Sequence, residues 1–200
     1  MRPRDRHLVM FVKAPRLGRV KTRLARDIGG VAAWAFYRRM VSDLARRLSV
    51  DGRWRSWLAI SPDGALWDGH RWPTTCDLVS QGSGDLGDRM GRVAAVLPTG
   101  PVVIIGADVP GITPGHIDQA FRALGGHDAV FGPSPDGGYW LVGLRRRPSF
   151  HDPFQGVRWS SPDALSDTRA NCPAGWRLAE LEMLEDVDDG PSYRRRQRQS

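Results

Sequence analysis

The stretch Pro101-Val-Val-Ile-Ile-Gly106, followed by Ala107-Asp108-Val109-Pro110, decides the fold of this chain. Its first half is apolar at successive positions, so both faces of the expected strand must be buried. Such strands are typical of parallel sheets that helices cover on both faces. Its second half places a carboxylate, Asp108, directly after the strand, and Pro110 then stops the sheet. The chain is therefore predicted to be an α/β protein built around a parallel sheet.

Strands and helices alternate on both sides of this stretch. Further strands are expected over 7–13, 54–60, 77–80, 128–131, 138–144 and 176–181. Helices are expected from about residue 22 and over 34–48, 85–97, 113–124 and 161–171. Alternation of this kind predicts three layers, with ligands bound beyond the carboxyl ends of the strands. We expect one domain over residues 1–190 and a basic, disordered tail over 191–200.

Composition places the chain among folded proteins. Of its 200 residues 40% are hydrophobic, including eight Trp and six Phe, which excludes a disordered chain. No apolar run approaches the ~20 residues that span a bilayer, and Leu8–Val12 is too short for the core of a signal peptide. A cytoplasmic location is therefore expected. Cys76 and Cys172 have no metal-binding or redox spacing and are expected to be reduced thiols.

A net charge of +7 raises nucleic-acid binding as a possible class. Much of the charge lies in three arginine clusters: Arg2, Arg4 and Arg6; Arg145 to Arg147; and Arg194 to Arg196 with Arg198. The sequence has no zinc-finger spacing, no RNP-like aromatic strand and no basic heptad pattern. Solvated charge is the favoured interpretation of these clusters, and nucleic-acid binding remains a remote alternative.

The only two lysines, Lys13 and Lys21, lie in the loop expected between the first strand and the first helix. An ammonium is a compact charge that suits phosphate oxygens, and the free N–H groups of a helix start also attract anions. Gly18 allows a close turn in this loop, and Arg23 adds a further charge. The loop is not a Walker motif, because two residues separate Gly18 from Lys21. It predicts a di- or triphosphate site, the alternative being an ordinary basic connection.

Two sets of carboxylates are candidate metal ligands. Mg²⁺ is commonly held by one or two carboxylates together with substrate phosphates, so Asp108 opposite the basic loop suits this ion. The alternative is that Asp108 only shapes a turn. Asp186-Val187-Asp188-Asp189 is a carboxylate cluster that could supply a second ligand, or else a solvated turn.

The loop Gln81-Gly-Ser-Gly84-Asp85 is a candidate for contacts with a nucleotide base. Its glycines allow a ring to approach the backbone, and the Gln81 amide can pair with a base edge. Asp85 can equally be a helix N-cap.

A tight turn, Ser134-Pro-Asp136-Gly137-Gly138-Tyr139, precedes the strand expected over 138–144. It predicts either a plain hairpin or a site in which Asp136 and Tyr139 contact a ligand that carries hydroxyls.

Five motifs together resemble a known family. They occur in the order K-A-P-x-x-G-x-V-K-T-R-L, Q-G-x-G-D-L-G-D-R-M, G-A-D-x-P, P-D-G-G-Y and F-x-G-V-x-W-S-S, within a resemblance that covers residues 8–188. They resemble a bacterial family of glycosyltransferase-A-like proteins labelled arsenosugar-biosynthesis or DUF-type glycosyltransferases. The K-T-R-L segment is also similar to 2-phospholactate guanylyltransferases and, more remotely, to molybdenum-cofactor nucleotidyltransferases.

This resemblance implies a three-layer α/β/α nucleotide-diphosphosugar transferase fold with a mostly parallel sheet. It implies phosphate contacts by Lys13, Lys21 and Arg23, and a Mg²⁺ or Mn²⁺ ion at Asp108. The late motif resembles D-V-D-T: Asp186-Val187-Asp188 is retained, and Asp189 stands in place of the Thr. Asp188 is the second metal ligand that this resemblance implies. Residues expected near the base and the remaining substrate are Gln81, Gly84, Asp85, Asp136, Gly137, Gly138 and Tyr139, with Gly18 in the phosphate loop.

The expected activity is metal-dependent transfer from a nucleotide-diphosphate donor. In glycosyl transfer, which the family label favours, the hydroxyl of a small-molecule acceptor attacks the anomeric carbon of a nucleotide sugar. In the alternative, nucleotidyl transfer, a phosphate of a small molecule attacks the α-phosphorus of an NTP and pyrophosphate leaves. Both reactions depend on stabilising phosphate charge, which agrees with the lack of a G-x-S-x-G nucleophile motif. Lys21, Arg23 and Asp108 are the residues expected to supply this stabilisation.

Overall fold

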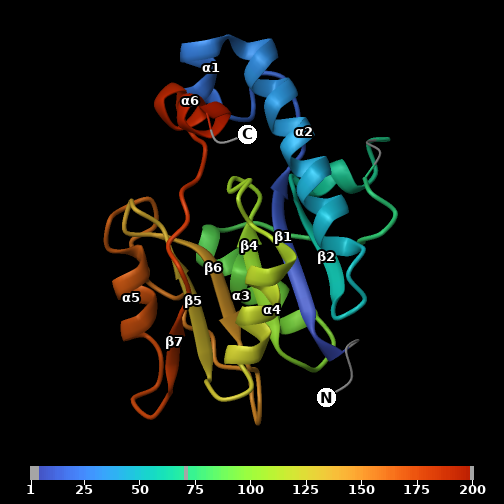
Figure 1. Ribbon diagram of the computed structural model, residues 1–200. Helices are drawn as coiled ribbons and strands as arrows, with labels where there is room; N and C mark the ends of the chain where they lie inside the picture. Colours follow the sequence, from blue (N-terminus) through green and yellow to red (C-terminus); the bar gives the residue numbers. More distant parts are fainter. Residues whose placement is uncertain (1–4, 70–71, 199–200) are drawn as a thin grey trace.

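A central sheet with helices on both faces organises the chain (Figure 1). The computed structural model describes residues 5–69 and 72–198. Within them the strands are β1 (His7–Lys13), β2 (Arg55–Ser61), β3 (Asp77–Ser80), β4 (Val102–Gly106), β5 (Ala129–Pro133), β6 (Tyr139–Leu144) and β7 (Leu178–Glu180). The helices are α1 (Thr22–Ile28), α2 (Gly30–Ser49), α3 (Leu86–Val96), α4 (Pro114–Ala123), α5 (Ala164–Ala170) and α6 (Gly190–Arg198), with a 3₁₀ turn η2 (Asp63–Leu66).

The sheet has the order β3-β2-β1-β4-β6-β5-β7. Pairing is parallel between β1, β2, β3 and β4 and between β5 and β7, whereas β6 runs antiparallel to both of its neighbours. The expected mostly parallel α/β sheet is therefore confirmed. Because β1 and β4 are parallel neighbours, with Phe11 opposite Gly106, the loops that follow them leave the same edge of the sheet.

Successive side chains of β1 point to opposite faces and supply two separate cores. Leu8 and Met10 pack in a cluster that α2 and α4 cover, while Val9 packs in a second cluster with residues of α3. The strand β4 divides in the same way, with Ile105 in the first cluster and Ile104 in the second. This burial on both faces is what the apolar stretch at 101–106 predicts.

Helix starts follow the capping residues that the sequence offers. Asp85 caps α3 in a reciprocal pair with Asp88, and Thr113 caps α4 with Pro114 at its first position. Between α1 and α2 the chain turns at Gly29, whose φ of 87° is open to glycine at little cost.

The disordered tail expected from residue 191 is wrong as far as the described residues reach, because 190–198 form α6. Asp189 and Ser192 exchange hydrogen bonds as a capping pair, with Ser192 N–H donating to Asp189 Oδ1 at 2.8 Å. The Tyr193 ring packs edge-on against Phe36 of α2 at 5.0 Å. These contacts offset the repulsion among the arginines of this segment. Residues 199 and 200 lie outside the described part.

Helices α1 and α6 pack against each other beyond the end of the sheet where β1 and β4 finish (Figure 1). The Gly190 N–H donates to Asp27 Oδ2 of α1 at 2.8 Å, which fixes the chain between β7 and α6 against this end. None of the helices in the described ranges is long and apolar enough to cross a membrane.

Candidate active site

A buried ammonium joins two carboxylates at the end of the sheet. Lys21 Nζ lies 3.2 Å from Asp108 Oδ1 and 3.4 Å from Asp188 Oδ1. The Lys21 side chain is 2% exposed, while those of Asp108 and Asp188 are 49% and 36% exposed. Arg23 Nη1 adds a second cation, 3.1 Å from Asp188 Oδ2. The structure thus brings together four of the residues singled out from the sequence, although they come from three distant segments.

The backbone explains why these residues meet. Lys21 follows β1 as the N-cap of α1, Asp108 follows β4, and Asp188 lies between β7 and α6. The Val187 N–H donates to the Asp108 carbonyl at 3.0 Å, which holds the late segment beside the end of β4. The site is therefore built on the sheet edge predicted to carry it.

Lys13 lies in a different part of the same loop. Its backbone is fixed by Tyr37, whose hydroxyl accepts from the Lys13 N–H at 2.9 Å and donates to the Lys13 carbonyl at 3.1 Å. Burial, and then the nearby Asp108 charge, raise the pKa of the Tyr37 hydroxyl, so it stays protonated. The exposed Lys13 side chain lines a cavity of about 320 Å³ together with Arg16 and Arg19.

This basic cavity is where the loop can accept an anion. Lys13, Arg16 and Arg19 line it with Ala14 and the β2 end at Ser61 and Pro62. Gly18, between the two arginines, has a φ of 74°. Arg16 is also paired with Asp68 at 2.6 Å. The loop thus separates its cations, with Lys21 and Arg23 on the carboxylates and Lys13 and Arg19 at the open cavity.

A larger cavity of about 360 Å³ opens beside Asp108. Its polar lining consists mainly of Asp108, Asp136 and Asp186 with Ser134, Ser160 and Ser161. Its apolar lining includes Phe11, Leu86, Met90, Val142, Tyr139 and Trp159. A small hydroxyl-bearing molecule fits such a lining.

Asp186 is a site residue that sequence reasoning did not select. Burial, together with the Asp188, Asp108 and Asp136 carboxylates, raises its pKa, and the Lys21 ammonium opposes this rise. Asp186 lines the larger cavity, whereas Asp188 contacts the cations. The sequence presents both residues as one carboxylate cluster, and the run Asp186 to Asp189 does not indicate which carboxylate faces which group.

The Gln81 loop is used largely by the fold itself. The buried Gln81 amide donates to the Ala59 carbonyl at 2.8 Å and to the Val12 carbonyl at 3.2 Å, which links β2 to β1. Asp85 is the N-cap of α3, and Gly84 precedes it with a φ of 98°. The base contacts expected of Gln81, Gly84 and Asp85 remain predictions, and the amide nitrogen of Gln81 is already bound.

The turn between β5 and β6 is a hairpin, and it also lines the larger cavity. Asp136 Oδ1 accepts from the Gly138 N–H at 3.0 Å, and Tyr139 pairs through its hydroxyl with Thr168 at 3.3 Å. Gly137 has a φ of 83°, and a Cβ there would lie 2.1 Å from the Pro162 carbonyl. The turn therefore packs directly on the segment 159–162. Its structure is compatible both with a plain hairpin and with a site in which Asp136 and Tyr139 contact a ligand that carries hydroxyls.

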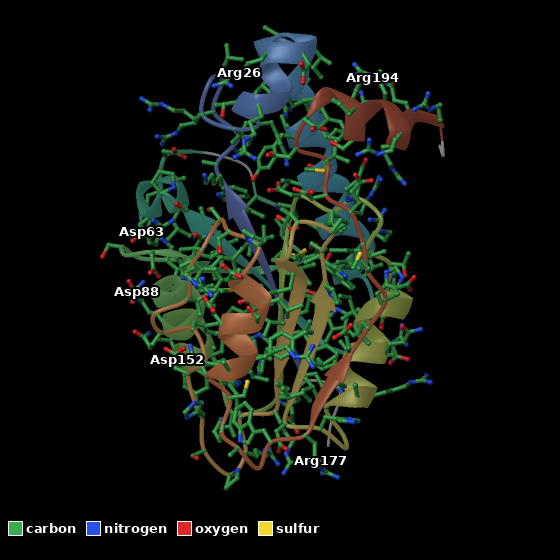
Figure 2. The ribbon with its side chains drawn as sticks, turned by 90° about the vertical axis from the view of Figure 1, so that its left-hand side faces the viewer. Arg26, Asp63, Asp88, Asp152, Arg177 and Arg194 are labelled. Carbon is green, nitrogen blue, oxygen red and sulfur yellow. The ribbon has the colours of Figure 1, made fainter. Side chains whose placement is uncertain are left out.

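Arginines lie at both ends of the molecule. Figure 2 shows Arg26 and Arg194 at the end formed by α1 and α6, and Arg177 at the opposite end, with Asp63, Asp88 and Asp152 along the side between them. The labelled arginines thus lie at opposite ends of the molecule, and nucleic-acid binding stays a remote alternative that the structure does not test.

The carboxylates suit a metal shared with a ligand rather than a closed protein site. In the described residues, no three His, Cys, Asp or Glu side chains are grouped so that they could hold a metal ion. Asp108 and Asp188, which flank Lys21, offer the hard oxygen donors that Mg²⁺ and Mn²⁺ prefer. Substrate phosphates would complete such a site.

Residues 44–161 match a protein family described as "Uncharacterized protein conserved in bacteria (DUF2064)". The matched range contains Asp108 and the turn at 134–139, and it begins after the loop that carries both lysines. None of the curated proteins compared matches the chain.

Among solved structures, a proposed nucleotide-diphospho-sugar transferase of Desulfovibrio desulfuricans is 29% identical, with a TM-score of 0.81, over 93% of this chain and 83% of that one. The Mycobacterium tuberculosis protein Rv0371c, solved in complex with manganese, is 16% identical over 96% and 97% of the two chains, with a TM-score of 0.57. The 4-diphosphocytidyl-2C-methyl-D-erythritol synthase of Anaerococcus prevotii is 10% identical over 99% and 97%, with a TM-score of 0.64. The last two likenesses show a shared fold.

Proposed function

The chain belongs to the bacterial family DUF2064, and we propose that it is a transferase that uses a nucleotide-diphosphate donor. The favoured reaction is glycosyl transfer from a nucleotide sugar to a hydroxyl of a small molecule. One observation carries the proposal: the buried Lys21 ammonium lies between Asp108 and Asp188, and Asp108 also lines a cavity with a hydroxyl and carboxylate lining. The likeness to the Desulfovibrio protein supports the donor class.

The donor phosphates are proposed to bind along the loop after β1. Lys13, Arg16 and Arg19 line its open cavity, and Arg23 lies on the first turn of α1. A nucleotide diphosphate carries its charge on a few oxygens, which cations of this density neutralise. Because the leaving group is that same diphosphate, its binding site also stabilises charge that develops in the reaction.

A divalent ion is part of the proposal. Asp108 and Asp188 are the residues that would hold it, and Mg²⁺ or Mn²⁺ there would supply further neutralisation of the phosphates. Lys21 orients both carboxylates through its contacts at 3.2 Å and 3.4 Å. The remaining cavity carboxylates, Asp136 and Asp186, are placed to accept hydrogen bonds from hydroxyls of the transferred sugar or the acceptor.

Nucleotidyl transfer is the second candidate. The open cavity of about 320 Å³ with Lys13, Arg16 and Arg19 suits a triphosphate as well as a diphosphate. An NTP in that cavity would present its α-phosphorus to a phosphate of a small molecule, with pyrophosphate leaving. The two reactions use the same cations. They differ in the acceptor that the larger cavity must bind, which is a hydroxyl compound in glycosyl transfer and a phosphorylated small molecule in nucleotidyl transfer.

A thermal-shift panel tests the proposal. NTPs and nucleotide sugars, each with and without Mn²⁺, are compared by the rise in the unfolding temperature. A ligand present at a hundredfold excess over its Kd adds about 2.7 kcal/mol, which is roughly 5–10 °C for a chain of this size. We expect such a rise with at least one nucleotide, greater with Mn²⁺ than without it.

Asp108→Asn should remove the Mn²⁺-dependent part of that rise. Asp43→Asn is the matched control, since the Asp43 side chain is 48% exposed, close to the value for Asp108, and is paired with Arg46 on α2. If no nucleotide shifts the unfolding temperature of the unaltered protein, the proposed function is wrong.

A further inference from the structure

The larger cavity carries acidic side chains and no cation. Asp108, Asp136 and Asp186 contribute to its lining, and none of its lining residues, taken from the described part of the chain, is a lysine, arginine or histidine. The three serines add hydroxyls without charge. Any ligand bound here therefore meets a negative field.

The nearest cation does not change this sign. Lys21 touches Asp108, but its ammonium is shared with Asp188 and its side chain is 2% exposed. Arg23 contacts the second oxygen of Asp188, at 3.1 Å from its Oδ2, and does not line the cavity. The open cations Lys13 and Arg19 line the other cavity. The end of the sheet is thus divided into a basic cavity and an acidic one.

The acidic cavity also has a substantial apolar wall. Phe11 of β1, Met90 of α3 and Val142 of β6 contribute apolar surface from three elements. Tyr139 and Trp159 form a second wall, with their rings edge-to-face and 6.3 Å between centroids. A ligand that fills this space buries an apolar face and turns its polar groups toward the carboxylates and serines.

We propose that this cavity selects an acceptor without any anionic group, namely a neutral or cationic compound with a hydroxyl and an apolar portion. As an assignment of the acceptor, this rests on the proposed transferase function. A phosphate ester would place its charge beside three carboxylates with no cation among the lining side chains, and the divalent ion proposed at Asp108 would already be shared with the donor phosphates. The cavity therefore favours glycosyl transfer over nucleotidyl transfer to a phosphorylated small molecule.

Three probes that share one ring test the selection: benzyl alcohol, benzylamine and benzyl phosphate. Their Kd values are measured by NMR from the backbone amide signals of Ser160 and Ala164, which line this cavity, so binding at the basic loop is not counted. We expect benzyl phosphate to bind at least about tenfold more weakly than benzyl alcohol and benzylamine, which is about 1.4 kcal/mol.

A charge reversal in the lining sharpens the test. Asp136→Lys should weaken the binding of benzylamine and strengthen that of benzyl phosphate, so that the order of their Kd values is reversed. Asp43→Lys, on the outside of α2, changes the net charge of the protein equally and should leave the order as in the unaltered protein. Folding of both variants is checked by their far-ultraviolet circular dichroism and unfolding temperature.

The inference is overturned if benzyl phosphate binds the unaltered protein as tightly as benzylamine, or if none of the probes binds at these amides. Its failure is separable from that of the proposed function. If the protein binds nucleotides but prefers benzyl phosphate, only the proposed acceptor class is wrong. If the probes bind in the expected order but no nucleotide binds, the cavity is selective as inferred and the proposed transferase function is wrong.

Discussion

Lys21 holds a left-handed backbone conformation, with φ 47° and ψ 46°, directly before α1. For a residue with a Cβ this conformation is about 1–2 kcal/mol higher in free energy than a right-handed one, so it persists only where the surroundings require it. The requirement here is the ammonium between Asp108 and Asp188. Lys21 therefore has a structural task, and the phosphate contact expected of it from the sequence stays a prediction.

The two lysines should differ when each is changed to methionine. Lys21→Met leaves Asp108 and Asp188 facing each other without the ammonium, and we expect a loss of about 2 kcal/mol in the free energy of unfolding. Lys13→Met, at an exposed side chain, should change it by less than about 0.5 kcal/mol. Urea denaturation measures both. Equal stabilities for the two variants would show that Lys21 does not hold the carboxylates.

Single residues show where sequence reasoning reaches its limit. Lys21 could be selected because lysine is rare in this chain, and Asp108 because it follows a buried strand. The partners of Gln81 could not be known, since the carbonyls of Val12 and Ala59 approach it only in the assembled sheet. Asp186 was equally hidden, because its position at the cavity depends on the contact of Val187 with Asp108.

At the scale of the element, the end of α3 depends on one arginine. The Arg146 guanidinium donates to the Gly100 carbonyl at 2.7 Å and the Leu97 carbonyl at 3.2 Å, and also to those of Ala94 and Pro98. These carbonyls lie in and after the last turn of α3, where the helix leaves acceptors without partners. Burial lowers the pKa of Arg146 to about 10, so it remains charged at neutral pH.

Arg146→Met should remove this cap and leave several carbonyls unsatisfied. We expect the free energy of unfolding to fall by about 3 kcal/mol. Arg145→Met is the control, because Arg145 makes one ion pair, with Asp128 at 3.4 Å, and should cost about 1 kcal/mol or less. Thermal or urea unfolding distinguishes the two, and similar losses for both would mean that the cap contributes little.

The elements that can be predicted from the sequence are those marked by a nearby pattern, such as a strand-like run or a helix-capping residue. Apolar or alternating segments predict the strands from β1 to β6, and Asp85 and Thr113 predict the starts of α3 and α4. Helix α6 is not predicted from the sequence, because its arginines are typical of solvated charge, while the contacts that stabilise it come from Phe36 and Asp27, far away in sequence. The antiparallel direction of β6 follows from the short turn at 134–138, which cannot hold a crossover.

At the scale of the whole molecule, one buried histidine makes stability depend on pH. Burial, and next the Arg146 charge, lower the pKa of His7 to about 4. Its Nδ1 accepts from Trp57 Nε1 at 3.2 Å, which requires an unprotonated nitrogen. In the unfolded chain a histidine binds its proton near pH 6.5. Between these pH values the unfolded state holds more protons, so acid favours unfolding.

The free energy of unfolding should therefore fall as the pH is lowered from about 6.5 to about 4, by up to about 3 kcal/mol for this one group. In His7→Gln that part of the pH dependence should be absent, whereas His151→Gln, at an exposed side chain, should retain it. Urea unfolding across this pH range gives the slopes. An unchanged slope in His7→Gln would assign the acid sensitivity to other groups.

The contact of Lys21 with Asp188 joins residues 167 positions apart. Closing so long a loop is entropically costly until the intervening strands have paired, so we expect this contact to form late in folding. A partly folded chain could hold the complete sheet and still lack the arrangement of charges at its end. Chemical competence would then be acquired in the final step, and a molecule that opens only at this end would lose it while most of its structure persists.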